Sequence, residues 1–428
     1  MLAALANIFR ITELRQKVLF TLAMFIVFRA GTHIPVPGVN ASVIEQLFRS
    51  GNLFGLLDMF SGGALSKFSI FAMSITPYIN ASIILQLLKV VVPTLEQWSK
   101  EGEEGFKKTT KLTRMLTVAL AFIQACGMAY GLKMAINNPG IFSILLIALT
   151  LTAGTVFLMW IGEQITARGV GNGISLIIFA GIVSRLPDGL KVIFQYLQAG
   201  TVSLLNVILF AAIALAMVVF VIIISEGIRK IPVQYAKRVV GRKQYGGQST
   251  HIPVKVCMSG VMPIIFAMSF MSLPSTIGMF KGPYADPDGF WQRFYNGFLN
   301  FFSTTSGWYA LIYFVLIIAF NYFYVSMQYN PIEIANQLRQ NNGGIPGIRP
   351  GKPTSDYIQR VLSKITLVGA FFLGIIAIFP IILGMFDNNL RSLSMGGTTV
   401  LIVVSVALET VRTLESQMMM RHHKGFLE

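Results

Sequence analysis

Charged residues are scarce in this chain of 428 residues, because Asp, Glu, Lys and Arg together make up only 12% of it. An ordinary soluble domain carries about 25% charged residues. Hydrophobic residues make up 54% of the chain instead. Apolar runs of about 18 residues or more, long enough to cross a bilayer as a helix, recur from one end to the other. The composition excludes an ordinary soluble protein and predicts an all-α polytopic membrane protein.

Cysteine and histidine are also rare. The two cysteines, Cys126 and Cys257, lie in apolar runs and lack the spacing of a disulfide or a metal site. The four histidines lie near loops or in the tail, and no Ser/His/Asp set falls in the apolar runs. The segment GEEGFKKTT at Gly102 lacks the spacing of a phosphate-binding loop and predicts a polar turn. We therefore expect no catalytic site, no metal and no cofactor, and an intramembrane hydrolase would lack its nucleophile–base pair.

Ionisable side chains are almost absent from the interiors of the apolar runs. One charge at the centre of a membrane helix costs about 2.5–3.5 kcal/mol, so such groups mark coupling sites for ions and protons where they occur. Glu163 and Glu226 lie at the ends of runs, and Asp58 lies in an interrupted one. This absence counts against the main alternative function, an inverted-repeat secondary transporter of solutes. It leaves open a pore that is closed by apolar side chains.

The apolar runs predict ten membrane spans in two halves, residues 1–195 and 196–428. Pro187 is expected to close the fifth span. An odd number of spans per half makes the second half enter from the opposite face, so the two halves would be inverted relative to each other. The spans lie near Val18–Thr32, Phe68–Val92, Leu112–Ala135, Ile141–Gly162, Ile174–Leu186, Leu204–Ser225, Val256–Ile277, Trp308–Met327, Ile365–Phe386 and Thr398–Val411.

The net charge of +16 could indicate a nucleic-acid-binding protein, but its distribution indicates membrane topology. With a cytoplasmic N-terminus, 25 of the 34 Lys and Arg residues fall on the cytoplasmic side, 8 fall in outer loops and Arg29 falls in the first span. Cytoplasmic loops of membrane proteins carry such an excess of Lys and Arg. Both termini are therefore predicted to be cytoplasmic.

Two cytoplasmic loops, residues 226–255 and 328–364, are longer and more basic than orientation requires. The second contains Gly343-Gly344 and the turn-forming run PGIRPGKP. Long loops in a compact protein are usually functional or disordered. The turn chemistry favours a shaped protrusion, and we expect it to bind a large cytoplasmic partner.

The stretch Asn52–Pro93 looks like a membrane span that is interrupted. Its first apolar part, Leu53–Phe60, is too short to cross a bilayer, and Asp58 and Gly62-Gly63 interrupt it. A longer apolar run, Phe68–Val92, follows. Irregular backbone at membrane depth is tolerated only inside protein or against a water-filled cavity. The stretch predicts a half-helix that folds back before a full helix, and hence a cavity.

Isoleucines repeat at helical spacing in two of the spans. Ile75 and Ile79 are four residues apart, as are Ile174 and Ile178, so each pair lies on one face of its helix. Isoleucine is ordinary packing or lipid-facing material in a membrane protein. The spacing alone does not choose between packing and an apolar pore lining.

Two long segments resemble the signatures of the SecY family, the central subunits of bacterial protein-conducting channels. They are FSIFAMSITPYINASIILQLL at Phe68 and WIGEQITARGVGNGISLII at Trp160. Further similar segments occur in the same order along the chain: THIPVPGV at Thr32, MFSGGALS at Met59, YAKRVVGRK at Tyr235, QSTHIPVKV at Gln248 and PGIRPGKPT at Pro346. The resemblance implies two inverted five-helix halves around a central pore. Its function would be to pass unfolded secretory polypeptides across the membrane and to release membrane segments laterally into lipid.

The resemblance also implies roles for individual residues. An apolar pore ring would consist of Ile75, Ile79, Ile174, Ile178, Ile265 and Ile402. A plug, at about residues 52–66, would include Asn52, Leu53, Phe54, Leu57, Asp58, Met59, Phe60, Ser61, Gly62 and Gly63. A lateral gate would use Gln86, Gln124 and Cys257, where Cys257 stands in place of the polar amide usual in the family. Ser74 replaces the usual glycine of the first signature, which we expect to have little effect because serine is also small.

The implied partners are several. The basic loops would dock the ribosome and the SecA motor ATPase through Arg242, Lys243 and Arg349, since arginine suits contact with carboxylate or phosphate. SecE-like and SecG-like small membrane subunits, substrates that bear signal sequences, and the lipid bilayer would complete the system. The implied location is the bacterial plasma membrane.

Overall fold

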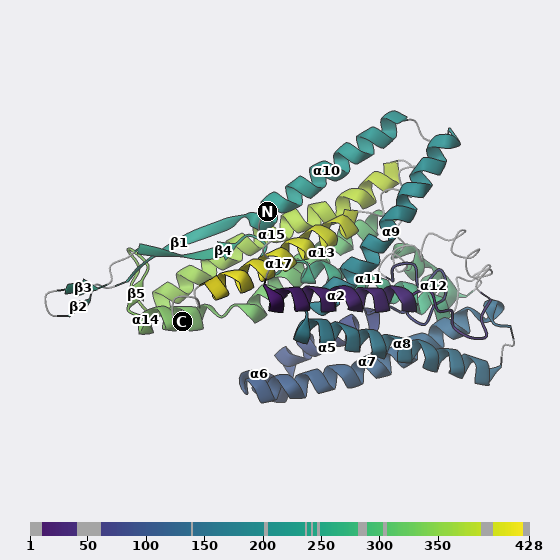
Figure 1. The fold of residues 1–428 in the computed structure, drawn as a ribbon, viewed down its shortest axis with the longest axis horizontal. Coiled ribbons are helices and arrows are strands. Elements are labelled where there is room, and N and C mark those ends of the chain that lie inside the picture. The colour runs from purple at the N-terminus through teal and green to yellow at the C-terminus, as the bar shows by residue number, and fades with distance from the viewer. Residues whose placement is uncertain are drawn as a thin grey trace. The chain divides into compact units, whose positions relative to one another are not determined.

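The computed structural model describes residues 11–40, 61–137, 140–200, 204–235, 238–240, 243–245, 249–280, 289–302, 306–386 and 397–422. Helices dominate these residues (Figure 1). The chain divides into two compact units. Unit 1 consists of Met1–Ile208, Met268–Tyr309 and Val406–Glu428, and unit 2 consists of Leu209–Ala267 and Ala310–Ser405. The five-plus-five division at residue 195 stays a prediction.

Each of the ten predicted spans coincides with a helix. These helices are α2 (Thr12–Gly31), α5 (Thr76–Val91), α7 (Glu103–Gly131), α8 (Ile141–Arg168), α9 (Gly173–Gln198), α10 (Leu204–Glu226), α11 (Met262–Phe280), α13 (Gly307–Gln328), α15 (Lys352–Phe386) and α17 (Gly397–His422). Among the described residues, five helices are long and apolar enough to cross a membrane on their own, and a bent pair is a sixth candidate. The chain is thus a multi-pass membrane protein by composition, while the count of ten stays a prediction.

Several predicted boundaries differ from the helix ends, and in three of them the reason for the prediction is wrong. The second span was expected from Phe68, but residues 61–75 form turns and α5 begins only at Thr76. Pro187 was expected to close the fifth span, yet it lies inside α9, which continues to Gln198. The seventh span was expected from Val256, but bends and turns precede α11. Apolar runs and prolines do not by themselves locate helix ends, because the neighbouring packing decides whether backbone groups find partners.

Four short elements lie between the span helices. The helix α6 (Pro93–Lys100) follows α5 with a bend of 104°. The 3-10 turn η1 is Lys133–Ala135, α12 is Phe290–Phe301 and α14 is Pro331–Gln340. Proline at the second position of α5 and at the first position of α6 fits helix starts, since its missing N–H would have no partner in the first turn.

Unit 1 is built around closely packed helices, with α7 against α5 and α8, and α8 against α9. Ala121, Ala125 and Ala129 repeat every four residues along α7 and are fully buried, so the neighbouring helices can approach closely. Gly154 serves the same purpose on α8, because a Cβ there would lie 1.9 Å from the Ile70 carbonyl oxygen. Between α7 and α8, Arg114 donates two hydrogen bonds of 2.8 Å to the Glu163 carboxylate.

Unit 2 contains the two basic loops, and both carry ordered structure. Strand β1 (Ile228–Tyr235) pairs antiparallel with β4 (Ser249–Lys255), and its far end pairs with β5 (Gly343–Gly344). The short strands β2 (Arg238–Val240) and β3 (Lys243–Tyr245) pair with each other. A core that includes Ile231, Val233, Leu338, Ile358 and Leu362 joins the sheet to α14 and α15. The described parts of both loops are therefore ordered, while their role as a cytoplasmic protrusion stays a prediction.

Candidate functional site

Residues 61–75 form a series of turns that is largely buried in unit 1, and they end where α5 begins. Gly62 and Gly63 have φ of +66° and +85°, a left-handed conformation that glycine adopts without a steric penalty. A Cβ on Gly62 would lie 3.1 Å from the Cα atom of Gly181 on α9. Irregular backbone buried in protein is the arrangement predicted for the interrupted span. The plug positions Asn52–Phe60 lie outside the described residues.

Arg29 ties the start of this segment to two helices. From α2, its Nη1 atom donates to the carbonyl oxygen of Gly62 at 3.1 Å and to the Ser184 hydroxyl on α9 at 3.2 Å. The Ser184 hydroxyl in turn donates to the carbonyl oxygen of Gly181 at 2.8 Å. Arginine within a predicted membrane span thus has a specific use here, which is to hold the backbone at Gly62.

The middle of the segment is held by backbone pairing and aromatic packing. The Val36 N–H donates to the Phe68 carbonyl oxygen at 3.0 Å, and the Ile70 N–H donates to the Ile34 carbonyl oxygen at 3.0 Å. Phe71 stacks on Phe28 of α2, with ring centroids 6.3 Å apart. Residues 61–75 are therefore fixed at both ends and in the middle.

The backbone conformation of Ser74 explains why the signature that this segment resembles has a glycine here. Its φ is +52°, so the backbone is left-handed immediately before α5. A non-glycine residue in this conformation costs roughly 1–2 kcal/mol. The expected small effect of serine follows from its size, which allows close packing. The position also requires a left-handed backbone, which glycine adopts at lower cost than serine.

Four of the six ring candidates lie in unit 1, one immediately before α5 and three on α5 and α9. Ile75 precedes the first turn of α5 and is 1% exposed, and Ile79, whose N–H donates to the Ile75 carbonyl oxygen, is half-buried. Ile178 is buried on α9. Ile174, in the first turn of α9, packs against α8, since a Cβ on Gly162 would meet its Cδ1 atom at 2.6 Å.

The other two ring candidates, Ile265 on α11 and Ile402 on α17, lie in unit 2 and are also buried. The six side chains thus come from four helices, and all are apolar and buried or half-buried. The ring as a whole stays a prediction.

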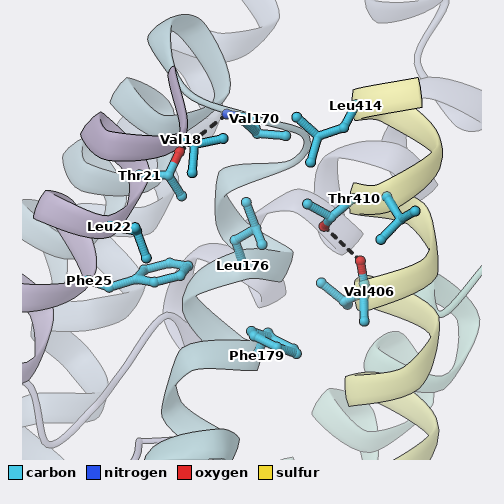
Figure 2. A pocket seen from close by; sticks show the side chains of 12 residues that line it. Val18, Thr21, Leu22, Phe25, Val170, Leu176, Phe179, Val406, Thr410 and Leu414 are labelled. Carbon is cyan, nitrogen blue, oxygen red and sulfur yellow. Dashed lines mark hydrogen bonds between the residues drawn. The ribbon is translucent and has the colours of Figure 1, made fainter. Parts of the chain in front are cut away.

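Unit 1 also contains an apolar cavity of about 270 Å³ between α2, α9 and α17. Figure 2 shows Thr21 and Thr410 among its lining side chains. The Thr21 hydroxyl accepts from the Val170 N–H, and the Thr410 hydroxyl donates to the Val406 carbonyl oxygen (Figure 2). The Thr21 hydroxyl also donates to the Lys17 carbonyl oxygen. Both hydroxyls hydrogen-bond within the chain, and the other ten lining residues are apolar.

A polar cluster in unit 2 was missed by the sequence reasoning. Ser259, in the turn before α11, donates to the side-chain oxygen of Asn321 on α13, and both residues are buried. The Asn321 amide nitrogen donates to the carbonyl oxygen of Thr366 on α15 at 3.0 Å. The signal in the sequence was a single asparagine within the apolar run FVLIIAFNYFYV. This asparagine joins three elements of unit 2.

We expect Asn321→Leu to lower the stability of unit 2 by roughly 1–3 kcal/mol, because the buried Ser259 hydroxyl would lose its acceptor. The thermal unfolding midpoint of the chain in detergent would measure the loss. Tyr322→Phe is the matched control, since it removes only an exposed hydrogen bond to the Ser363 carbonyl oxygen and should change little. An unchanged midpoint for Asn321→Leu would contradict this role.

Comparison with known proteins decides the family. The family model described as SecY matches residues 69–411, which include residues 69–75, α5, the ring candidates and the polar cluster. This chain belongs to the SecY family. The chain is 48% identical to the protein translocase subunit SecY of Halalkalibacterium halodurans and 47% identical to that of Bacillus subtilis, and each match covers 100% of both chains.

Solved structures of SecY and Sec61 channels share the fold. A protein-conducting channel is similar with a TM-score of 0.67 and 18% identity, over 94% of this chain and 92% of that one. Sec61 from a canine ribosome–channel complex of the endoplasmic reticulum is similar with a TM-score of 0.62 and 16% identity, over the same shares. These likenesses support the helical membrane architecture of the SecY family for this chain.

The lateral-gate positions implied by the SecY resemblance lie on three elements. Gln86 on α5 and Gln124 on α7 are half-buried, and the Gln86 amide donates to the Ser82 hydroxyl at 3.5 Å. Cys257 is a half-buried free thiol in the turns between β4 and α11. Two residues further on, Ser259 enters the buried polar cluster. Ser259 thus supplies a polar group two residues from Cys257.

The docking positions of the SecY resemblance lie in the two loops of unit 2. Arg349 is exposed in the turn before α15, where its carbonyl oxygen accepts from the Thr354 hydroxyl at 2.8 Å. Lys243 begins β3, and Arg242 lies outside the described residues. Within the part of the chain that the structure describes, no group of three His, Cys, Asp or Glu residues could hold a metal ion.

Proposed function

We propose that this chain is a channel through which unfolded polypeptide crosses the membrane, and that it releases membrane segments laterally into lipid. The observation that carries the proposal is the buried, irregular segment 61–75, which replaces the first part of a membrane span and ends at Ile75. The relatives named protein translocase subunit SecY support it. A secondary transporter would instead need ionisable ligands within its spans.

The proposed pore is closed by apolar side chains and by the plug. Six isoleucines from four helices would form the ring, and an apolar constriction can exclude water and ions when closed. Isoleucine side chains would move aside for an extended polypeptide without breaking hydrogen bonds. Arg29 and Ser184 would hold the described end of the plug, Ser61–Gly63, beside α2 and α9.

The proposed lateral gate uses Gln86, Gln124 and Cys257, with α5, α7, α11 and α13 as its helices. Amide side chains hydrogen-bond across helices in membranes, with about 0.6–2 kcal/mol per bond. Bonds of this strength can keep the lateral gate closed and still break when a signal sequence enters. In this proposal residues 1–195 and 196–428 are inverted halves on either side of the pore.

The proposed partners follow from the basic loops and from the relatives. The structurally similar Sec61 comes from a ribosome–channel complex, and a similar yeast Ssh1 complex is bound to the 80S ribosome. For this chain we propose the ribosome, a SecA motor ATPase, and SecE-like and SecG-like subunits, in the bacterial plasma membrane with cytoplasmic termini. The chain itself would catalyse nothing, and energy would come from ATP hydrolysis by the motor or from elongation on the ribosome.

Reconstitution tests the function. The chain would be placed in vesicles with its small subunits, the motor ATPase and a secretory precursor. The precursor should become protected from added protease only after ATP is supplied. Absence of protection under all conditions, together with saturable uptake of a small solute, would favour the transporter alternative.

Charge reversal at Arg349 tests the docking surface. Loss of a hydrogen-bonded charge pair from an interface costs about 2–5 kcal/mol, so Arg349→Glu should raise the motor concentration for half-maximal ATPase stimulation by about tenfold or more. Arg360→Glu is the matched control, because Arg360 is exposed on α15 and the change in charge is the same. A wild-type response of Arg349→Glu would remove this residue from the surface.

A further inference from the structure

The helix α12 lies between α11 and α13 in the chain and is rich in aromatic residues (Figure 1). Its sequence is FWQRFYNGFLNF, and none of its twelve residues is buried. Phe290 and Trp291 are each 76% exposed, and Phe294 is 60% exposed. Several of these rings contact one another within the helix, as Trp291 does with Phe290 and Phe294 at centroid distances of 5.9 and 6.3 Å.

The residues of α12 separate into two faces. Gln292, Asn296 and Asn300 are spaced four apart and share one face with Arg293. The apolar residues occupy the opposite half of the helix: Phe290, Trp291, Phe294, Tyr295, Phe298, Leu299 and Phe301. An apolar half opposite a polar half is the pattern of a helix that lies at a boundary between water and an apolar phase.

A helix of this length needs cover for its apolar face. Isolated helices shorter than about 12–15 residues are marginal in water, and most helical stability in proteins comes from packing of an apolar face. The described part of the chain does not bury any residue of α12. The described residues therefore leave Phe290, Trp291 and Phe294 of the apolar face exposed.

The aromatic face continues into the apolar surface of α13. Phe301 at the end of α12 stacks on Trp308 in the first turn of α13, with ring centroids 5.8 Å apart. Trp308, Leu311 and Val315 follow one face of α13 and are all exposed. The helix α13 is among those long and apolar enough to cross a membrane, so this face is suited to lipid. Trp is enriched at the boundary between bilayer and water.

We infer that α12 lies in the surface plane of the bilayer, at the outer end of α13, with its aromatic face inserted among the lipids. The occupant of the face is the lipid surface, and the exposed polar side chains of Arg293 and Asn300 face water. Such helices insert about 5–10 Å below the headgroups. The helix would fix the depth at which α13 enters the membrane. This role concerns anchoring and does not depend on what the chain transports.

Fluorescence quenching in vesicles tests the inference. The four tryptophans allow a single-Trp variant that keeps Trp291 and has Trp98, Trp160 and Trp308 replaced by Phe. We expect lipids with a doxyl group at carbon 5 to quench Trp291 more than lipids with the group at carbon 12. Aqueous acrylamide should quench it several-fold less than in the urea-unfolded chain.

The matched control moves the probe to the polar face. A variant with Trp291→Phe and Asn300→Trp, at an exposed position of the polar face, should show weaker lipid quenching and stronger acrylamide quenching. Equal acrylamide access at both positions, without lipid quenching, would overturn the inference. So would shielding of Trp291 that arises only when a partner protein is added.

Spin labels give a second route if the single-Trp chain does not fold. A label at Phe294→Cys should be more accessible to oxygen, and a label at Asn300→Cys more accessible to a water-soluble nickel chelate. The reverse order would overturn the inference. Neither measurement uses translocation, so failure here would leave the proposed channel function untouched.

Discussion

The double substitution Ile79→Asn and Ile178→Asn is expected to raise the resting ion conductance of the reconstituted channel by about tenfold or more. An amide buried without a hydrogen-bond partner costs roughly 2 kcal/mol or more, so the two amides would draw water into the closed ring. Since 1.4 kcal/mol corresponds to about tenfold in an equilibrium, the hydrated state of the ring would become strongly favoured. Planar-bilayer recordings without substrate would measure the leak.

Leucine at the same two positions is the control, because a volume-conserving apolar change keeps the ring dry and usually costs less than about 1.5 kcal/mol. We expect Ile79→Leu with Ile178→Leu to keep the wild-type conductance. If the asparagine variant folds, binds its small subunits and still shows wild-type conductance, neither isoleucine belongs to the constriction.

Arg29→Leu is expected to release the segment that begins at Ser61. The wild-type guanidinium donates to the Gly62 carbonyl oxygen and to Ser184, and hydrogen bonds to charged groups contribute about 1.5–3 kcal/mol each. Losing both would shift the population of the released segment by at least about tenfold. The variant should therefore leak ions at rest and export precursors with defective signal sequences.

Two further variants separate this holding role from general damage. Ser184→Ala removes one of the two partners and should give an intermediate leak. Gly62→Ala should release the segment with Arg29 intact, because its Cβ would crowd Gly181 at a φ of +66°. If the Arg29→Leu channel neither leaks ions at rest nor exports precursors with defective signal sequences, Arg29 has no part in closing the pore.

Local apolar patterning predicted most of the fold. The starts of α8 at Ile141 and α10 at Leu204 agree with prediction, since each follows a clear break in hydropathy. Residues 68–75 could not be predicted in this way, because their apolar composition is equally that of a helix. Their turns depend on contacts with Ile34, Val36 and Phe28, which are distant in the sequence.

The candidate site was predictable only in part. The isoleucine spacing could be read from the sequence, but its meaning came from the family resemblance. The polar cluster was missed because the partners of Asn321 lie 62 residues before it and 45 residues after it. The helix α12 could not be predicted from the length of apolar runs, because its twelve residues are too few to cross a membrane.

Site-specific cross-linking to an arrested substrate tests the central claim that polypeptide passes through the isoleucine ring. A photoreactive residue would replace Ile79, Ile178 or Ile402 in turn, and the exposed Leu87 of α5 as control. A secretory precursor fused to a tightly folded domain would be arrested during ATP-driven transport. We predict adducts with the precursor from the three ring positions and none from Leu87. Protected precursor that forms no adduct with any ring position would contradict the account.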